Sequence, residues 1–171
     1  MTTYGGELEV AEEGPSRVVA FRKDFALLLW GKGITVEEAH GFGRATRRNL
    51  SAAPRVSSLV WLTGLPASAP TDEVRVVLAR IIANAPPSFV ALHYAVEGEG
   101  FGSAVARAVV TGLNLQARAT LPLRVHASVA EAMSAIAKDL SWSATEAQQV
   151  QQGLEAMRAD WAQRGGTPLG S

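Results

Sequence analysis

The chain has 171 residues, enough for one well-cored domain and too few for two of ordinary size. Lysine plus arginine number 16 and aspartate plus glutamate number 16, so the formal net charge is zero, whereas general nucleic-acid-binding proteins carry a basic excess. The absence of cysteine excludes disulfides, thiolate catalysis and cysteine-ligated metal or iron–sulfur centres, and it fits a reducing cytoplasm. Composition therefore predicts a globular, cytoplasmic protein without a nucleic-acid partner.

The N-terminal segment and the apolar runs show no pattern of targeting or membrane insertion. Residues 1–7 lack the basic and apolar regions of a signal peptide. The longest apolar runs, residues 25–30 and 89–96, are far shorter than the roughly 20 residues that cross a bilayer. Residues 1–16 contain glutamates and no basic residue, so we expect an acidic lead in which Leu8 and Val10 are compatible with a short edge strand.

A β-hairpin opens the ordered part of the chain. Residues 17–21 and 25–30 have the composition of strands, and the short polar segment between them predicts a tight connection. Thr35 and Glu38 have the capping-box spacing, which predicts the start of a helix that ends before Pro54.

Strands and helices alternate after that helix. Strand–helix–strand units of this length imply right-handed crossovers and parallel pairing. The predicted fold class is therefore α/β, a single domain over residues 17–140 with a mixed, mostly parallel sheet. Its remaining elements are expected, in chain order, as a strand over 57–62, a helix over 71–85, a strand over 89–96, a helix from 103 to about 117 and a strand over 123–127.

Two further helices are expected at the C-terminus. Ser128 with Glu131, and Ser143 with Glu146, have the capping-box spacing. The second helix covers residues 143–164 and precedes a flexible tail over 165–171. Its apolar residues form one narrow stripe with heptad spacing, which leaves two interpretations open: the helix packs on its own domain, or the stripe is a dimer or partner interface. The stripe consists of Val150, Leu154, Met157 and Trp161.

The order of elements and two local segments carry a family resemblance. The segments are Leu59-Val60-Trp61-Leu62-Thr63-Gly64 and Gly98-Glu99-Gly100-Phe101. With the hairpin and the alternating helices and strands, they resemble the STAS domain of bacterial anti-sigma-factor antagonists, within the broader STAS/SEC14-like group. The resemblance covers roughly residues 17–140. It implies a signalling or regulatory module that binds a protein partner.

Antagonists of that family carry an Asp-Ser-type phosphorylation motif at the start of the helix after the third strand. Residues 66–72 here are Pro-Ala-Ser-Ala-Pro-Thr-Asp, so the motif is degenerate. Ser68 and Thr71, with Thr63 nearby, are the phosphorylation candidates, because a helix N-terminus favours a phosphate. The alternative is that Thr71 is only a helix cap and the other two hydroxyls are loop residues.

A glycine-rich segment and the three histidines are further candidate sites. Gly98, Gly100, Gly102 and Ser103 follow a strand and open a helix, which suits an anion or ligand cradle, but the spacing matches neither the dinucleotide fingerprint nor the P-loop. A tight turn that needs glycine is the alternative. His40 is expected on a helix. His93 and His126 are expected in strands, with His93 a hydrogen-bonded core residue rather than a metal ligand.

A basic cluster closes the first helix. Arg44, Arg47 and Arg48 either engage an acidic partner or phosphate, or simply complement the helix dipole. In the second helix, Val76 and Ala83 fall off the main apolar face, so we expect a contact on a second side, most simply with the last helix.

These patterns favour a non-enzymatic STAS-like interaction or regulatory module, with self-association as one form of partner binding, and with no cofactor and no metal. The alternative is a small-ligand or lipid-binding domain of the SEC14-like kind, with a cavity between helices and sheet lined by residues such as Trp30, Trp61 and Phe101. A hydrolase using Ser68, His93 or Glu99 ranks last, because the chain has no Gly-x-Ser-x-Gly elbow.

Overall fold

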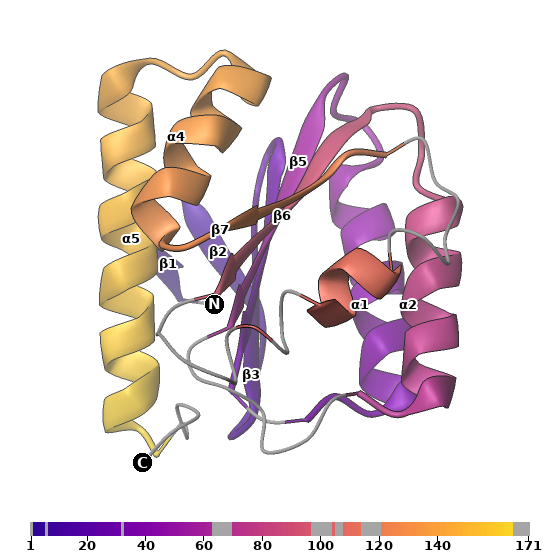
Figure 1. The fold of residues 1–171 in the computed structure, drawn as a ribbon. Coiled ribbons are helices and arrows are strands. Elements are labelled where there is room, and N and C mark those ends of the chain that lie inside the picture. The colour runs from indigo at the N-terminus through magenta and orange to yellow at the C-terminus, as the bar shows by residue number, and fades with distance from the viewer. Residues whose placement is uncertain are drawn as a thin grey trace.

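A single mixed β-sheet lies between two layers of helices (Figure 1). The computed structural model describes residues 2–5, 7–31, 33–62, 70–96, 104, 108–113 and 121–165. The strands are β1 (Thr3–Tyr4), β2 (Leu8–Glu13), β3 (Arg17–Arg22), β4 (Phe25–Trp30), β5 (Val56–Leu62), β6 (Phe89–Val96) and β7 (Leu123–His126). The helices are α1 (Val36–Leu50), α2 (Asp72–Ala83), α4 (Val129–Leu140) and α5 (Ala144–Gln163); residues 108–113 are also helical, within the range expected for the third helix.

The seven strands lie in the sheet in the order in which they occur along the chain. Neighbouring strands from β1 to β4 are antiparallel, and those from β4 to β7 are parallel. The prediction of an α/β fold with an opening hairpin and a mixed sheet is confirmed, with the parallel part confined to the C-terminal half. Leu8 and Val10 do form a strand, and β1 pairs with its outer side, so β2 is not the edge strand that was expected.

The topology explains which helices cover which face. Because β4 to β7 advance in one direction, crossovers of a single hand place α1 and α2 on one face of the sheet. The pair α4 and α5 covers the other face (Figure 1). Strand β4 alternates accordingly: Phe25, Leu27 and Leu29 face α4 and α5, while Ala26 and Leu28 face α1.

The expected contact between the second helix and the last helix is wrong. Helices α2 and α5 lie on opposite faces of the sheet (Figure 1), and α2 packs beside α1 instead. Val76 and Ala83 are exposed. Periodicity indicated that these residues leave the main apolar face, but it could not indicate whether anything covers them.

Helix α5 packs on its own domain. Its stripe of Val150, Leu154, Met157 and Trp161 is buried against the sheet and α4, with at most 1 % of each residue exposed. The interface interpretation of these four residues is therefore wrong, because no partner reaches them while the helix is docked. Strands β1 and β2 of the acidic lead lie directly beneath α5.

Gly153 has a packing role that its low helix propensity does not suggest. A Cβ atom built on Gly153 would lie 2.3 Å from the carbonyl oxygen of Gly5. Glycine is therefore required here, because it lets the helix backbone approach the N-terminal strands closely.

Polar contacts fasten both ends of α5. Before its first turn, the indole nitrogen of Trp142 donates to Asp24 Oδ2 at 2.8 Å, and the buried Arg22 guanidinium lies over the same indole. Near its last turn, the indole nitrogen of Trp161 donates to the carbonyl oxygen of Gly14 at 2.7 Å. These contacts tie α5 to the β3–β4 turn at one end and to the β2–β3 turn at the other.

Candidate functional site

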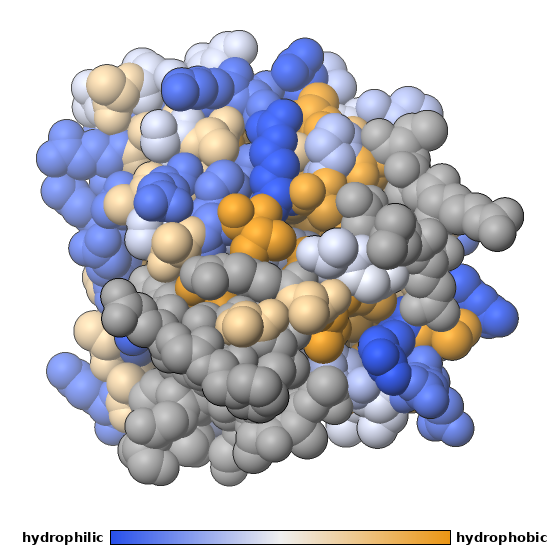
Figure 2. Space-filling view, in the orientation of Figure 1, coloured by the Kyte–Doolittle hydropathy of each residue, from blue (hydrophilic) through white to orange (hydrophobic). Residues whose placement is uncertain are grey.

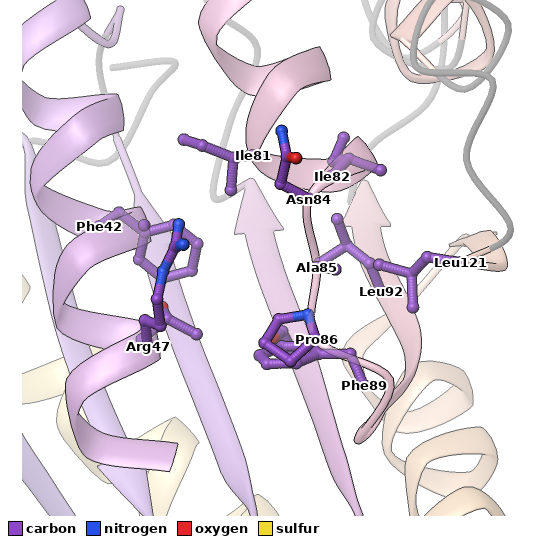
Figure 3. A pocket seen from close by; sticks show the side chains of 13 residues that line it. Phe42, Arg47, Ile81, Ile82, Asn84, Ala85, Pro86, Phe89, Leu92 and Leu121 are labelled. Carbon is purple, nitrogen blue, oxygen red and sulfur yellow. The ribbon is translucent and has the colours of Figure 1, made fainter. Parts of the chain in front are cut away.

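A cavity opens between α1, the C-terminal end of α2 and the sheet (Figure 3). Its volume is about 60 Å³, several times the 10–15 Å³ or so that one water molecule requires. Most of its wall is apolar, which is the usual character of a small-molecule site. We call it the α1–α2 cavity; it is lined by Phe42, Gly43, Thr46, Arg47, Ser58, Ile81, Ile82, Asn84, Ala85, Pro86, Phe89, Leu92 and Leu121.

Two residues that line this cavity have buried hydroxyl groups without a hydrogen-bond partner among the described residues. Thr46 of α1 is 7 % exposed and Ser58 of β5 is 2 % exposed. Neither Oγ1 of Thr46 nor Oγ of Ser58 has a partner among the residues that the structure describes. The neighbouring Ser57 points to the opposite face, and its hydroxyl donates to the carbonyl oxygen of Ala91 at 3.2 Å. A buried hydroxyl that forms no hydrogen bond costs about 1–3 kcal/mol, so the pair is an exception that calls for a reason.

The local sequence explains how the walls of the cavity are held. The predicted capping box of α1 is confirmed, with Glu38 N donating to Thr35 Oγ1 at 3.2 Å and Thr35 N donating to Glu38 Oε2 at 2.8 Å. Gly43 lets α1 approach α2, since a Cβ there would lie 3.1 Å from Ile81 Cδ1. The α2 helix ends at Asn84, and Pro86 then carries the chain under the cavity into β6.

One charged residue lines the cavity among those that the structure describes. It is Arg47 of α1. Its side chain rises beside Phe42, opposite Ala85 and Pro86 (Figure 3). The cavity surface is thus almost wholly carbon, and the hydroxyls of Thr46 and Ser58 are buried behind it.

A second polar cluster lies on the opposite face of the sheet. His93 of β6 is fully buried; its Nδ1 lies 2.9 Å from Nε2 of His126, and its Nε2 lies 3.0 Å from Oδ2 of Asp139 on α4. Arg124 donates to the same carboxylate oxygen at 2.7 Å. Because an ionised carboxylate only accepts, His93 donates from Nε2 and accepts at Nδ1 from His126. The chain His126–His93–Asp139 therefore links β7, β6 and α4.

Burial keeps both imidazoles neutral. Desolvation lowers the pKa of His93 to about 4, although the Asp139 carboxylate acts in the opposite direction. Desolvation also lowers the pKa of His126. The prediction that His93 is a hydrogen-bonded core residue is confirmed. Because both nitrogens of the fully buried His93 already have partners, the ring is not placed to meet a substrate.

No protein-family model, no curated protein and no solved structure matches this chain.

The predicted site residues fall into three groups. Thr71 is the exposed N-cap of α2, and its hydroxyl accepts from Val74 N at 3.4 Å, as the simpler interpretation expected. Arg44, Arg47 and Arg48 are exposed on α1, and none of them forms an ion pair with another described residue. The remaining candidates lie outside the described residues: Thr63, Ser68, Gly98, Gly100, Gly102 and Ser103.

The residues that were expected to line a ligand cavity, Trp30, Trp61 and Phe101, are not among the described residues that line the α1–α2 cavity. Trp61 is buried on the α4–α5 face, under the guanidinium of Arg158, so it does not line the α1–α2 cavity. Trp30 faces the α1 side but lies near Ile34, away from this cavity. Phe101 is outside the described residues.

Sequence reasoning missed the residues that distinguish the cavity and the histidine cluster. Thr46 lies at the helical spacing of the apolar residues of α1, and Ser58 lies in a run of mostly apolar residues, so neither stands out in the sequence. The sequence signal that could have indicated them is one hydroxyl residue on the inner face of a helix and one on a strand expected to pack against it. For the cluster, parallel register places Ala95 beside His126 and His93 beside Arg124, which brings the two imidazoles to one face.

The described residues contain no group of three histidine, aspartate or glutamate side chains arranged to hold a metal ion. Within the same residues, every helix is either too short or too polar to cross a bilayer.

Proposed function

We propose that this chain is a non-enzymatic binding module that takes a small molecule in the α1–α2 cavity. The observation that carries the proposal is the apolar α1–α2 cavity, two of whose lining residues, Thr46 and Ser58, have hydroxyls that are buried without a partner among the described residues. An apolar pair of the same shape would pack there at no cost in unmade hydrogen bonds. A polar ligand would satisfy both groups only if the side chains of this wall shift when it binds, because both hydroxyl oxygens are enclosed. Stability given up at one place in a core is typical of a binding site.

The small-ligand alternative is favoured over a lipid-binding function by the size of the cavity. About 60 Å³ holds only a few heavy atoms, so most of a lipid acyl chain would not fit and would stay exposed to solvent. It is favoured over the hydrolase hypothesis because His93 is buried with both ring nitrogens bonded. The histidine cluster then serves the docking of α4 on β6 and β7.

The test is a nuclear magnetic resonance titration of the folded chain with a library of small amphiphilic molecules. We expect at least one compound to shift the resonances of Phe42, Ile81 and Leu92 together, with a measurable Kd. In Thr46→Val, which keeps the shape of the side chain, the same compound should bind at least about tenfold more weakly.

Ser57→Ala is the matched control, because this neighbouring hydroxyl is on the other face of β5 and has its own partner. It should leave the Kd unchanged. The proposal fails if no compound perturbs the cavity resonances, or if Thr46→Val and Ser58→Ala bind every hit as tightly as the original chain.

A STAS-like protein-interaction or regulatory module is the second candidate. The element order after the hairpin and the three exposed arginines of α1 support it, because cations on one helix that form no ion pair with a described residue suit an acidic partner surface. Light scattering over a range of concentrations tests self-association. A dimer that dissociates in Arg44→Glu/Arg48→Glu would support this candidate, and a monomer at every concentration would remove self-association from it.

A further inference from the structure

We infer that an acidic segment of a protein partner docks on the outer surface of α1 and α2 and places one aliphatic side chain in the α1–α2 cavity. This inference rests on the cavity of the proposed function and adds a partner to it, since a small molecule and the partner's side chain exclude each other there. It is drawn from the charge of the helical surface and from the size and carbon lining of the cavity.

Arginines without a partner gather on one layer of the molecule. Among the described residues, arginine side chains with no ion pair, hydrogen bond or ring contact occur on α1 and α2 alone. Arginines on other elements have partners, as Arg22 has Asp24 and Arg164 has Glu13. The exposed arginines without a described partner, which we call the basic surface, are Arg44, Arg47, Arg48 and Arg80.

The packing of the two helices brings these arginines together. Gly43 of α1 lies against Ile81 of α2, so their sequence neighbours Arg44 and Arg80 are at the same level of the layer. Residues 39–71 and 74–96 contain no aspartate or glutamate, and the carboxylates of α1 and α2 all lie in the first helical turns. The basic surface therefore has a positive potential, which attracts and orients an acidic partner.

The α1–α2 cavity opens within this surface. Arg47 belongs to both, because it lines the cavity and is exposed (Figure 3). The cavity surface is almost wholly carbon, so it suits an aliphatic group, which makes no demand on the enclosed hydroxyls of Thr46 and Ser58. A volume of about 60 Å³ is roughly four to six times what one water molecule requires and holds about four heavy atoms, as many as a leucine side chain has.

A group of this size binds tightly only as part of a larger ligand, because the affinity of a free ligand is limited by its number of heavy atoms. An anchor side chain on a protein adds to charged contacts around the cavity, and an apolar centre with a polar rim is the usual arrangement of a protein interface. A nucleic acid supplies phosphates but no branched aliphatic chain, and a lipid acyl chain exceeds the cavity. An acidic protein segment supplies both features.

The test uses short random peptides that are displayed on phage and selected on the folded full chain. We expect the enriched peptides to share one leucine, isoleucine or methionine with aspartate or glutamate on both sides. The enriched peptide is then synthesised and titrated, with the resonances of Phe42, Ile81 and Leu92 as the readout. Replacement of its aliphatic residue by alanine should weaken binding at least about tenfold.

Arg44→Gln/Arg48→Gln tests the charge of the basic surface without altering the lining of the cavity. This variant should bind the peptide at least about threefold more weakly at low salt, and should bind small molecules in the cavity as the original chain does. Lys23→Gln/Lys138→Gln is the matched control, because it removes the same charge from exposed lysines on other elements. It should change the Kd of the peptide less than about twofold.

The partner inference is overturned if selection yields no acidic peptide with an aliphatic residue, if the peptide binds without moving the cavity resonances, or if both double variants weaken it equally. Binding of a small molecule in the cavity would then leave the proposed function in place. If the peptide binds in the cavity and no small molecule does, the partner inference stands and the small-molecule function fails. Where both bind, each should displace the other.

Discussion

The two faces of the sheet differ in whether their buried polar side chains have hydrogen-bond partners. On the α4–α5 face, the large polar side chains have partners: Trp142 and Trp161 donate through their indole nitrogens, and Arg22 binds Asp24 and Glu146. On the α1–α2 face, the hydroxyls of Thr46 and Ser58 have none among the described residues, and a cavity lies beside them. The first face thus holds docked helices with its polar groups, and the second leaves a cavity and two buried hydroxyls unsatisfied among the described residues.

Some N–H groups on the α4–α5 face also lack hydrogen bonds, and the contrast with the hydroxyls is informative. Arg22 Nε and Trp61 Nε1 are buried without a hydrogen-bond partner in the described structure. Both side chains are engaged in other ways, Arg22 through its terminal nitrogens and Trp61 beneath Arg158. Neither of them lines the α1–α2 cavity.

The two helical layers also differ in the hydropathy of their surfaces. In the space-filling view, the α4–α5 layer presents mostly hydrophilic residues, while most apolar atoms on the same side of the molecule gather between the two helical layers and toward α2 (Figure 2). The large apolar side chains exposed among the described residues are Val76 on α2 and Val125 on β7.

The largest expected effect is the loss of stability when the packing of the α4–α5 face is disrupted at Trp161. Trp161→Ala should lower the free energy of unfolding by about 3–5 kcal/mol, because it leaves a cavity in the core and removes the bond to Gly14. Urea denaturation measures the loss. Trp161→Phe keeps the apolar bulk and should lose clearly less. A loss under about 1 kcal/mol together with a changed oligomeric mass would restore the interface interpretation of α5.

Acidification should weaken the same face. The pKa of His93 is lowered to about 4 in the fold, against about 6.5 in the unfolded chain, so the unfolded chain binds more protons between these values. Stability is therefore complete above pH 6.5 and falls as the pH drops toward 4, by at most about 3 kcal/mol, with His126 acting in the same direction.

Urea midpoints measured between pH 7 and pH 4.5 check this dependence. His93→Gln, which can still donate to Asp139 but does not titrate, should show a flatter profile in that interval. A slope that His93→Gln leaves unchanged would place the titration elsewhere. The interval lies above the ordinary pKa of most carboxylates, which separates the histidine effect from general acid unfolding.

A substitution at Gly153 tests how closely α5 packs on the N-terminal segment at the edge of the α4–α5 face. Helix propensity predicts that Gly153→Ala is stabilising, whereas the approach to Gly5 predicts a loss of about 1–3 kcal/mol. Gly41→Ala in α1 is the matched control, since only the end of the Arg44 side chain lies near its Cβ position, and it should be neutral or stabilising by up to about 1 kcal/mol. Thermal unfolding of both variants decides between them. Equal gains would contradict the close packing of α5 on β1.

The smallest expected effect is on the α1–α2 face and has the opposite sign. Without ligand, Thr46→Val should raise the free energy of unfolding by about 1 kcal/mol, because it removes a buried hydroxyl that has no partner. Ser57→Ala, which loses a bond to Ala91, should lower it by about 1 kcal/mol. Chemical denaturation resolves both changes. A destabilising Thr46→Val would mean that the hydroxyl is satisfied in solution.

The sequence predicted elements better than it predicted what covers them. Capping boxes located the starts of α1 and α5, and apolar runs located β4, β5 and β6, because these signals are local. The stripe on α5 was equally compatible with a core and an interface, since periodicity reports an apolar face but not its partner. Strand β1 was missed because two residues in an acidic segment become a strand only by pairing with β2.

The candidate site was harder to predict, for a physical reason. Thr46 and Ser58 are distinguished by the hydrogen bonds they lack, which depends on everything packed around them. His93, His126 and Asp139 meet only through the register of β6 with β7 and the docking of α4. Arg47 alone was anticipated, as one member of a basic cluster whose other members do not line the cavity.

The most direct test of the α1–α2 cavity as a binding site is a crystal structure of the chain grown with the compound that binds most tightly in the titration. The account predicts that compound inside the cavity, with its apolar part on Pro86 and Phe89. Ordered water on both hydroxyls, with no ligand in the cavity at saturating concentration, would contradict it.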